Sequence, residues 1–92
     1  MNMARKWMTQ LSSKLQLPGD VLAGLPRIEL VGEEECSIET HRGLLRYGEE
    51  EIVISSVIGD LAVKGACLRI RSMNRQRIVV IGRISGVELS GK

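Results

Sequence analysis

The stretch GDLAVKGACLRI, residues 59–70, decides the fold. Apolar residues alternate with other residues on both sides of Gly65, and such a period of two is typical of a strand with one buried face. The alternating positions are Leu61, Val63, Leu68 and Ile70. A glycine inside a strand pattern marks a bulge or a sharp bend. We therefore predict that a strand turns a corner at Gly65, where it can pass from one sheet to another.

A second segment has the same form, because Val80 and Ile81 lead to Gly82 and the pattern continues at Ile84. The other strand-like segments follow Pro26, where the apolar period changes from about four to about two. The strand-like segments cover residues 28–30, 36–40, 43–47, 52–54, 61–63, 67–71, 77–81 with its continuation at 83–84, and 87–89. Short strands separated by regular turns indicate a sandwich or a small barrel.

We therefore predict a mainly β fold, a small antiparallel β-sandwich of seven or eight short strands over residues 28–92. A short β-solenoid is the alternative, because strand–glycine–strand units also build coils. The two units differ in length, which favours the sandwich.

Residues 1–17 have helical periodicity. Four apolar residues are spaced by four and Met8 lies beside them, which places all five on one stripe of an amphipathic helix. The four are Met3, Trp7, Leu11 and Leu15. Pro18 and Gly19 end the helix. Residues 18–27 then form a linker, and the whole chain is expected to be one compact domain.

The apolar stripe, with Trp7 and Leu11 at its centre, has three interpretations. It packs on its own β-domain, it binds in a partner's groove, or it lies on a membrane surface. The chain has no run of roughly 18 apolar residues that could span a membrane. Polar residues interrupt the segment 7–17, so it does not resemble a signal peptide. We expect a cytoplasmic protein.

The composition is that of an ordinary globular protein, with 43% hydrophobic and 26% charged residues. Phe is absent, so the core must be aliphatic. Cys36 and Cys67 each lie alone in a strand-like segment, and we expect both to be buried, reduced thiols. Together with His41 they lack a metal-ligand spacing, so we expect neither a metal nor a cofactor.

Charge is unevenly distributed along the chain. Residues 20–60 carry ten acids and three bases, whereas residues 61–92 carry seven bases and one acid. One interpretation is that acidic and basic strands pair across the sheet. The other is a bipolar surface through which copies of the chain associate as a homo-oligomer.

The usual catalytic motifs are missing. The chain has no phosphate-binding loop, and Ser85 is shifted by one position from a nucleophile elbow. The glutamate runs 33–35 and 49–51 are expected to be solvated turns, because consecutive side chains diverge, although carboxylates also bind divalent cations. We expect a protein that is not an enzyme.

Four residues of the β-domain are candidates for an interaction surface. His41 and Arg42 precede Gly43 between two strands, where we expect a turn with a positive φ at Gly43 and a hydrogen bond from His41 to the backbone. Arg69 and Arg71 share one strand face, so the alternative hypothesis is a nucleic-acid-binding module that uses the Arg-rich C-terminal half. No aromatic residue alternates with them, which argues against that alternative.

Several of these segments together resemble the YabP/YqfC family of bacterial sporulation proteins. The similarity rests on residues 25–32, on His41-Arg42-Gly43, on the spacing of residues 59–70 and on Ile81-Gly82-x-Ile84. The helix-led form, with Trp7 and residues 15–18, is similar to YqfC. In the family an Asn often precedes the His, whereas Thr40 stands here.

The resemblance implies a β-sandwich made in the mother cell of an endospore-forming bacterium, and it implies no catalytic mechanism. We therefore expect a non-catalytic sporulation protein that acts through protein partners. Our interaction candidates are Trp7, Leu11, His41, Arg42, Arg69 and Arg71.

Overall fold

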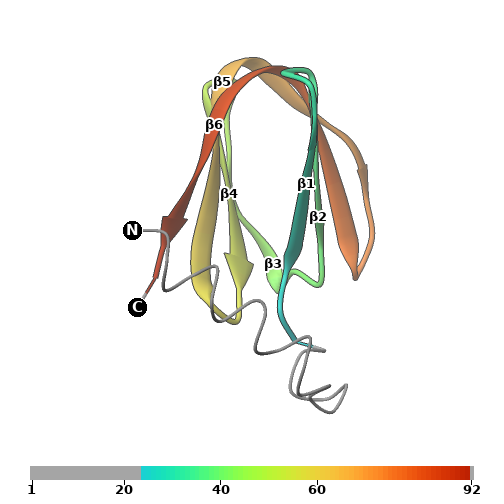
Figure 1. The fold of residues 1–92 in the computed structure, drawn as a ribbon, viewed down its shortest axis with the longest axis vertical. Helices are drawn as coiled ribbons and strands as arrows, with labels where there is room; N and C mark the ends of the chain where they lie inside the picture. The colour runs from blue at the N-terminus through green and yellow to red at the C-terminus, as the bar shows by residue number, and fades with distance from the viewer. Residues whose placement is uncertain (1–23, 92) are drawn as a thin grey trace, which may run out of the picture.

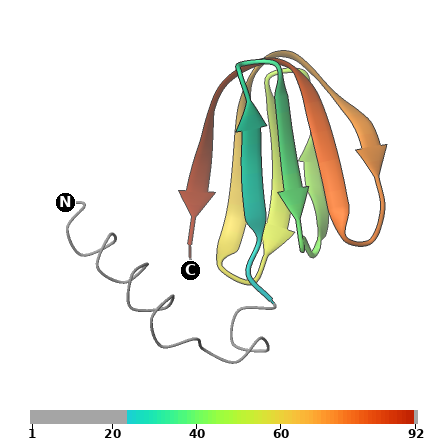
Figure 2. The same cartoon turned by 45° about the vertical axis from the view of Figure 1, so that its right-hand side comes forward.

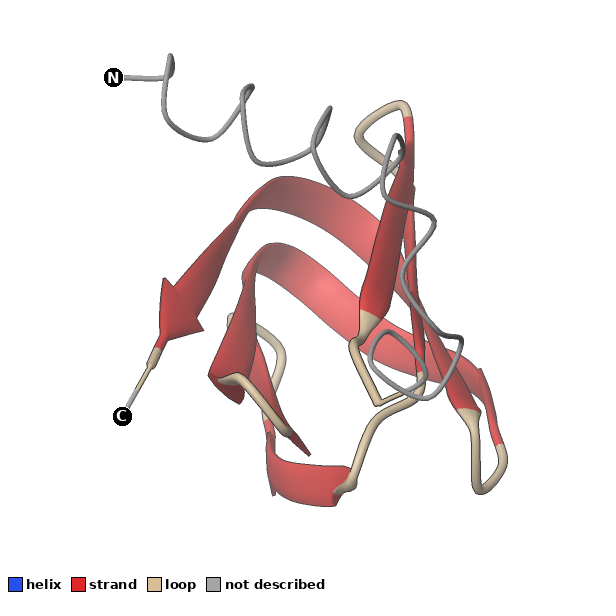
Figure 3. Ribbon diagram, turned by 60° about the horizontal axis from the view of Figure 1, so that its bottom comes forward, coloured by secondary structure: helices blue, strands red, loops and turns tan. Residues whose placement is uncertain are grey.

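The computed structural model describes residues 24–91, which form six strands and no helix (Figures 1 and 3). The strands are β1 (Arg27–Val31), β2 (Glu35–Glu39), β3 (Gly43–Tyr47), β4 (Glu51–Ser56), β5 (Gly59–Met73) and β6 (Arg77–Ser90). They form one antiparallel sheet in the order β1-β2-β6-β5-β4-β3. The predicted helix at 1–17 and most of the linker at 18–27 lie outside the described residues.

The sheet folds over on itself because β5 and β6 are long and bent (Figure 1). Of β6, only residues 77–81 pair with β2. Of β5, only residues 59–64 pair with β4. The first half therefore contains β1, β2, the start of β6 and the end of β5. The second half contains β3, β4, the start of β5 and the end of β6. The two halves face each other across the core (Figure 3).

The core is a single aliphatic cluster, as the absence of Phe required. It comprises Cys36, Ile38, Ile52, Ile54, Leu61, Val63, Leu68, Ile78, Val80 and Ile84. Both halves contribute side chains to this cluster, because alternate residues of every central strand point inward. The alternation read from the sequence therefore identified the buried face.

Two glycines make the bend. A Cβ atom at Gly65 would overlap the carbonyl oxygen of Arg83 on the neighbouring strand, and one at Gly82 would lie 2.6 Å from the carbonyl oxygen of Cys67. Gly82 also has a φ of 139°, which side chains disfavour. The backbones of β5 and β6 therefore approach each other at a distance that only glycine permits.

The predicted bend at Gly65 and Gly82 is thus confirmed, but the predicted number of strands is wrong. The glycines bend the strands without ending them, so residues 61–63 and 67–71 belong to one strand, as do 77–81 and 83–89. The chain forms one folded sheet rather than the two sheets of a sandwich. The β-solenoid is also wrong, because neighbouring strands are antiparallel.

The two halves repeat the same plan. Each has a hairpin whose turn begins with Gly-Glu-Glu-Glu, at residues 32–35 and at 48–51. In each, the last glutamate of the run pairs with the residue just before the bending glycine: Glu35 with Ile81, and Glu51 with Lys64. β1-β2-β6 and β3-β4-β5 are therefore equivalent units related by an approximate two-fold axis through the bend.

The Gly65→Ala substitution should lower the free energy of unfolding by about 3 kcal/mol, because the new methyl group meets backbone that cannot rotate away. Gly86→Ala is the matched control in the same sheet, since a Cβ there meets no atom within 4 Å. Urea unfolding measures both, and the control should stay within about 0.5 kcal/mol of the parent. Equal effects of the two substitutions would contradict the close approach.

Cys36 is fully buried in the core. Its burial raises the pKa of the thiol from 9.0 to about 11, because the thiolate would lose its hydration. A folded-state pKa above the unfolded value means that the stabilising contribution is complete below pH 9 and is lost as the pH rises towards 11.

We therefore expect the free energy of unfolding to fall by about 2 kcal/mol more between pH 8 and pH 11 in the parent than in Cys36→Ala. Other alkaline groups titrate in both proteins, so the difference between their pH profiles isolates Cys36. Denaturant unfolding across this range gives the comparison, and parallel profiles would contradict it.

Candidate interaction groove at the bend of the sheet

The turn between β3 and β4 continues the backbone ladder at the bend. The carbonyl oxygens of Glu49 and Glu50 accept hydrogen bonds from the N–H groups of Leu68 (2.9 Å) and Gly65 (3.1 Å). The two glutamate side chains remain exposed. The turn is thus fixed through its backbone while its charges face solvent.

The turn between β1 and β2 does the same on the other side. The carbonyl oxygens of Glu33 and Glu34 accept from the N–H groups of Ile84 (2.7 Å) and Gly82 (3.2 Å). The interpretation of both glutamate runs as solvated turns is confirmed at these four residues. Within residues 24–91, no three acidic, histidine or cysteine side chains gather closely enough to hold a metal ion.

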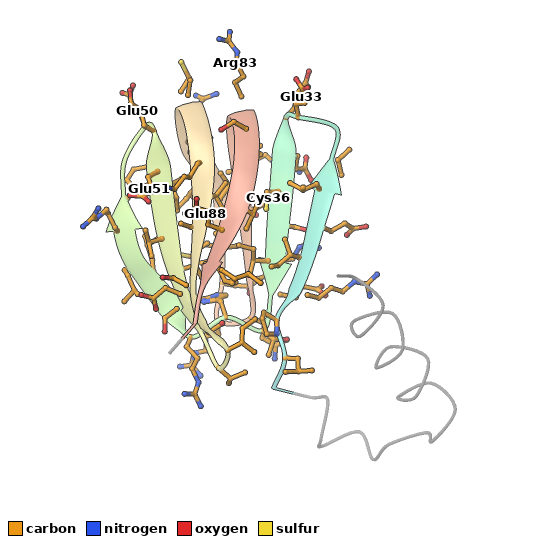
Figure 4. All side chains as sticks on the ribbon, turned by 60° about the vertical axis from the view of Figure 1, so that its left-hand side comes forward. Glu33, Cys36, Glu50, Glu51, Arg83 and Glu88 are labelled. Carbon is orange, nitrogen blue, oxygen red and sulfur yellow. The ribbon has the colours of Figure 1, made fainter. Side chains whose placement is uncertain are left out.

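Between the two turns lies an open groove of about 1260 Å³. Figure 4 places Arg83 at the bend between Glu50 of one turn and Glu33 of the other. The groove is lined by Val31, Glu33, Glu34, Glu35, Tyr47, Gly48, Glu49, Cys67, Leu68, Arg69, Arg71, Ile81, Gly82 and Arg83. Its walls are therefore acidic and its floor carries arginines.

The groove combines these charges with exposed apolar surface. Tyr47 is 57% exposed and Val31 is 59% exposed, and they precede the two acidic turns. Arg71 pairs with Glu35 at 3.2 Å, so one arginine of the floor is tied to a wall. Arg69 and Arg83 are exposed and pair with no carboxylate among the described residues. The surface thus offers an aromatic ring and two guanidinium groups to a partner.

Charges elsewhere pair across neighbouring strands, as one of the two charge interpretations predicted. Lys64 of β5 lies 3.8 Å from Glu51 of β4 and 3.2 Å from Glu88 of β6. Such exposed pairs contribute roughly 0–1 kcal/mol each. Of the two, only the Lys64–Glu51 pair joins the acidic part of the chain, residues 20–60, to the basic part, residues 61–92, and self-association stays a prediction.

Cys67 corrects the expectation for the cysteines. Both are free thiols, but only Cys36 is buried. Cys67 is exposed at the irregularity between Ala66 and Arg69, with a φ of 55°. Its exposure follows the alternation of residues 67–71, in which Leu68 is buried and Cys67, Arg69 and Arg71 are exposed. The expectation of burial followed from the residue type, whereas the position of Cys67 directly before the inward-facing Leu68 indicates exposure.

His41 and Arg42 lie at the opposite end of the fold. The His41 Nε2 lies 2.8 Å from the Asn74 carbonyl oxygen, and the Gly43 N–H donates to Nδ1 (2.9 Å). These contacts assign the neutral tautomer with hydrogen on Nε2. With a φ of 126° at Gly43, the predicted turn is confirmed. Arg42 donates its backbone N–H to the Ser55 carbonyl, and its side chain is exposed.

The candidates therefore do not form one site. Arg69 and Arg71 line the groove, whereas His41 contacts Asn74, which follows them by five and three residues, or about 17 and 10 Å along the strand. Trp7 and Leu11 lie outside the described residues. Sequence reasoning missed Tyr47 and the role of the two acidic turns. The repeated Gly-Glu-Glu-Glu was the signal that could have found them.

His41→Ala should lower the free energy of unfolding by about 1–2 kcal/mol, because the half-buried Gly43 N–H loses its acceptor. Arg42→Ala is the matched control in the same loop and should change it by less than about 0.5 kcal/mol. Thermal or urea unfolding of both variants measures the difference. A stable His41→Ala protein would assign His41 a role outside the turn.

Comparison with known proteins fits these observations. Residues 24–92 match the sequence profile described as the YabP family. The chain belongs to the YabP family. It is 34% identical over 86 residues to the uncharacterized protein YqfC of Bacillus subtilis (strain 168), an alignment that covers 94% of this chain and 89% of that protein. No solved structure matches the chain.

The family resemblance seen in the sequence is thereby confirmed. The matched family region begins at residue 24 and includes all six strands, the groove and the His41 turn. Within the described residues, no helix has the length and apolar character needed to cross a membrane.

Proposed function

We propose that this YabP-family protein is a non-catalytic sporulation protein that acts in the mother cell by binding a protein partner in the groove at the bend. The observation that carries the proposal is the groove itself, where an exposed tyrosine and exposed arginines lie between two acidic turns. Tyrosine and arginine are the residue types that dominate binding energy at protein interfaces.

The edge of the sheet beside the groove supports a protein partner. β4 pairs with β5 only as far as Lys64, and the Glu49 carbonyl reaches Leu68. Beyond that point β5 pairs only with β6 among the described strands, so the peptide groups of residues 69–73 face an open edge. An extended segment of a partner can add to such an edge through backbone hydrogen bonds.

The mixture of charges favours protein over nucleic acid. Phosphates would approach Arg69 and Arg83 between walls of glutamate, which repel them, and Arg71 is already paired with Glu35. The other C-terminal arginines, Arg75 and Arg77, lie in and after the β5–β6 turn, away from the groove. A protein surface with both signs of charge complements this groove better than a polyanion does.

The separation of reactive groups favours binding over catalysis. A nucleophilic Cys67 would need a base within hydrogen-bond reach. His41 is instead held at the far end of β5 by Asn74 and Gly43, with both ring nitrogens engaged. The groove therefore offers recognition chemistry and no paired nucleophile and base.

The test is capture from sporulating cells of an endospore-forming bacterium, followed by titration with the purified partner. The double variant Tyr47→Ala, Arg69→Glu should weaken binding about thirtyfold or more, the loss expected for one interface hot spot of about 2 kcal/mol. Arg75→Glu is the control at the opposite end and should bind as the parent does. Thermal unfolding must first establish that both variants fold.

Equal binding of the parent and the groove variant would overturn the proposed surface. Capture that nuclease abolishes, with a steep salt dependence on RNA or DNA, would replace the protein partner by a nucleic acid. A partner detected only in the forespore would contradict the mother-cell part of the proposal.

A further inference from the structure

The folded sheet leaves its core open on two flanks, which the approximate two-fold axis relates. The first flank lies between β1 and the end of β6, and the second lies between β3 and the end of β5 (Figures 2 and 3). Four apolar residues that are only partly buried pack against the core, two at each flank. They are Ile28 and Val87 at the first flank and Leu44 and Ile70 at the second.

The first flank exposes core-facing side chains to solvent. Leu30 pairs with Cys36, and Leu89 pairs with Leu61. Both partners are fully buried, and residues directly opposite each other share one face of a sheet, so Leu30 and Leu89 point to the core side. Nevertheless Leu30 is 51% exposed and Leu89 is 56% exposed. These edges lack the cover that the central strands receive from the facing half.

We propose that residues 3–15 of the same chain cover the first flank, with the stripe of Met3, Trp7, Leu11 and Leu15 seated on Leu30 and Leu89. Residues 1–23 precede Gly24, which leads directly into β1, one edge of this flank. A 13-residue helix is about 20 Å long, close to the length of the five-residue edge strand β1. The nine residues from Leu15 to Gly24 span up to about 30 Å, which suffices to return along the flank.

Charge distinguishes the two flanks. Residues 1–19 carry three bases and no acid. The outer faces at the first flank carry Glu29 on β1 and Glu88 on β6, with Arg27 at the start of β1 and Arg83 beside the bend. Glu88 pairs with Lys64 at 3.2 Å, whereas Glu29 pairs with no base among the described residues.

The second flank carries Arg46, Arg69 and Arg71 on its two edges and no acid. Arg46 pairs with Glu51 and Arg71 with Glu35, each at 3.2 Å, which leaves Arg69 without a carboxylate partner among the described residues. A basic segment therefore fits the first flank, which offers the unpaired Glu29, better than the second, whose edges carry no acid, and this leaves the second flank and the adjoining groove free.

Trp7 is the single tryptophan of the chain and reports directly on the stripe. In the full chain its emission should be blue-shifted relative to the unfolded protein and shielded from acrylamide. Leu30→Glu and Leu89→Glu should each remove the shift and raise quenching several-fold. Met73→Glu is the matched control at the second flank. Met73 pairs with Ile78 near the end of β5, just as Leu89 pairs with Leu61 near the end of β6. The Met73→Glu substitution should leave Trp7 unchanged.

The remaining outcomes overturn the proposal. A blue shift that disappears on dilution from micromolar to nanomolar protein would place the segment on a second copy. A shift that appears only with anionic vesicles would place it on a membrane. Equal responses to Leu89→Glu and Met73→Glu, or emission that matches the unfolded protein, would leave the flank without this cover. The readout involves no partner, so it is independent of the proposed function.

Discussion

The contact on which the structure depends is the approach of two backbones at Gly65 and Gly82. Each glycine lies against a carbonyl oxygen of the neighbouring strand, where a Cβ would collide. This approach lets β5 and β6 bend together while they stay paired along their length. Because both strands pass through the bend, the two halves share one core without a separate connection between sheets. The acidic turns then bond to the N–H groups that the bend would otherwise leave without partners.

The sequence predicted features that depend on local geometry. The period of two located the strands, the glycines located the bend, and the His41 turn followed from the short segment between two strands. The number of strands could not be predicted, because a glycine that bends a strand and one that ends it look alike in one sequence. The groove also escaped prediction, since it joins residues from five strands and two turns. Likewise, the positive φ of 55° at Cys67 was not predicted, because no neighbouring residue indicates it.

The two units have the same backbone plan but different surfaces. Both have an acidic turn, a bending glycine and an incompletely covered flank. Their edges differ in charge, because one pair of edges carries both glutamates and arginines and the other carries arginines alone. A basic segment and a partner of mixed charge can therefore be directed to different sides of an almost symmetric scaffold.

The order of the strands also determines how the domain can assemble. β3, β4, β5 and β6 follow one another in the chain as antiparallel neighbours, so their pairings close short loops. β2 instead pairs with β6, and its Glu39 meets Arg77 only after β3, β4 and β5 have intervened. Closing that long loop costs more conformational entropy than closing any hairpin. During synthesis the hairpin of β1 and β2 emerges first, yet it must wait, with the acidic turn it carries, until β6 has left the ribosome.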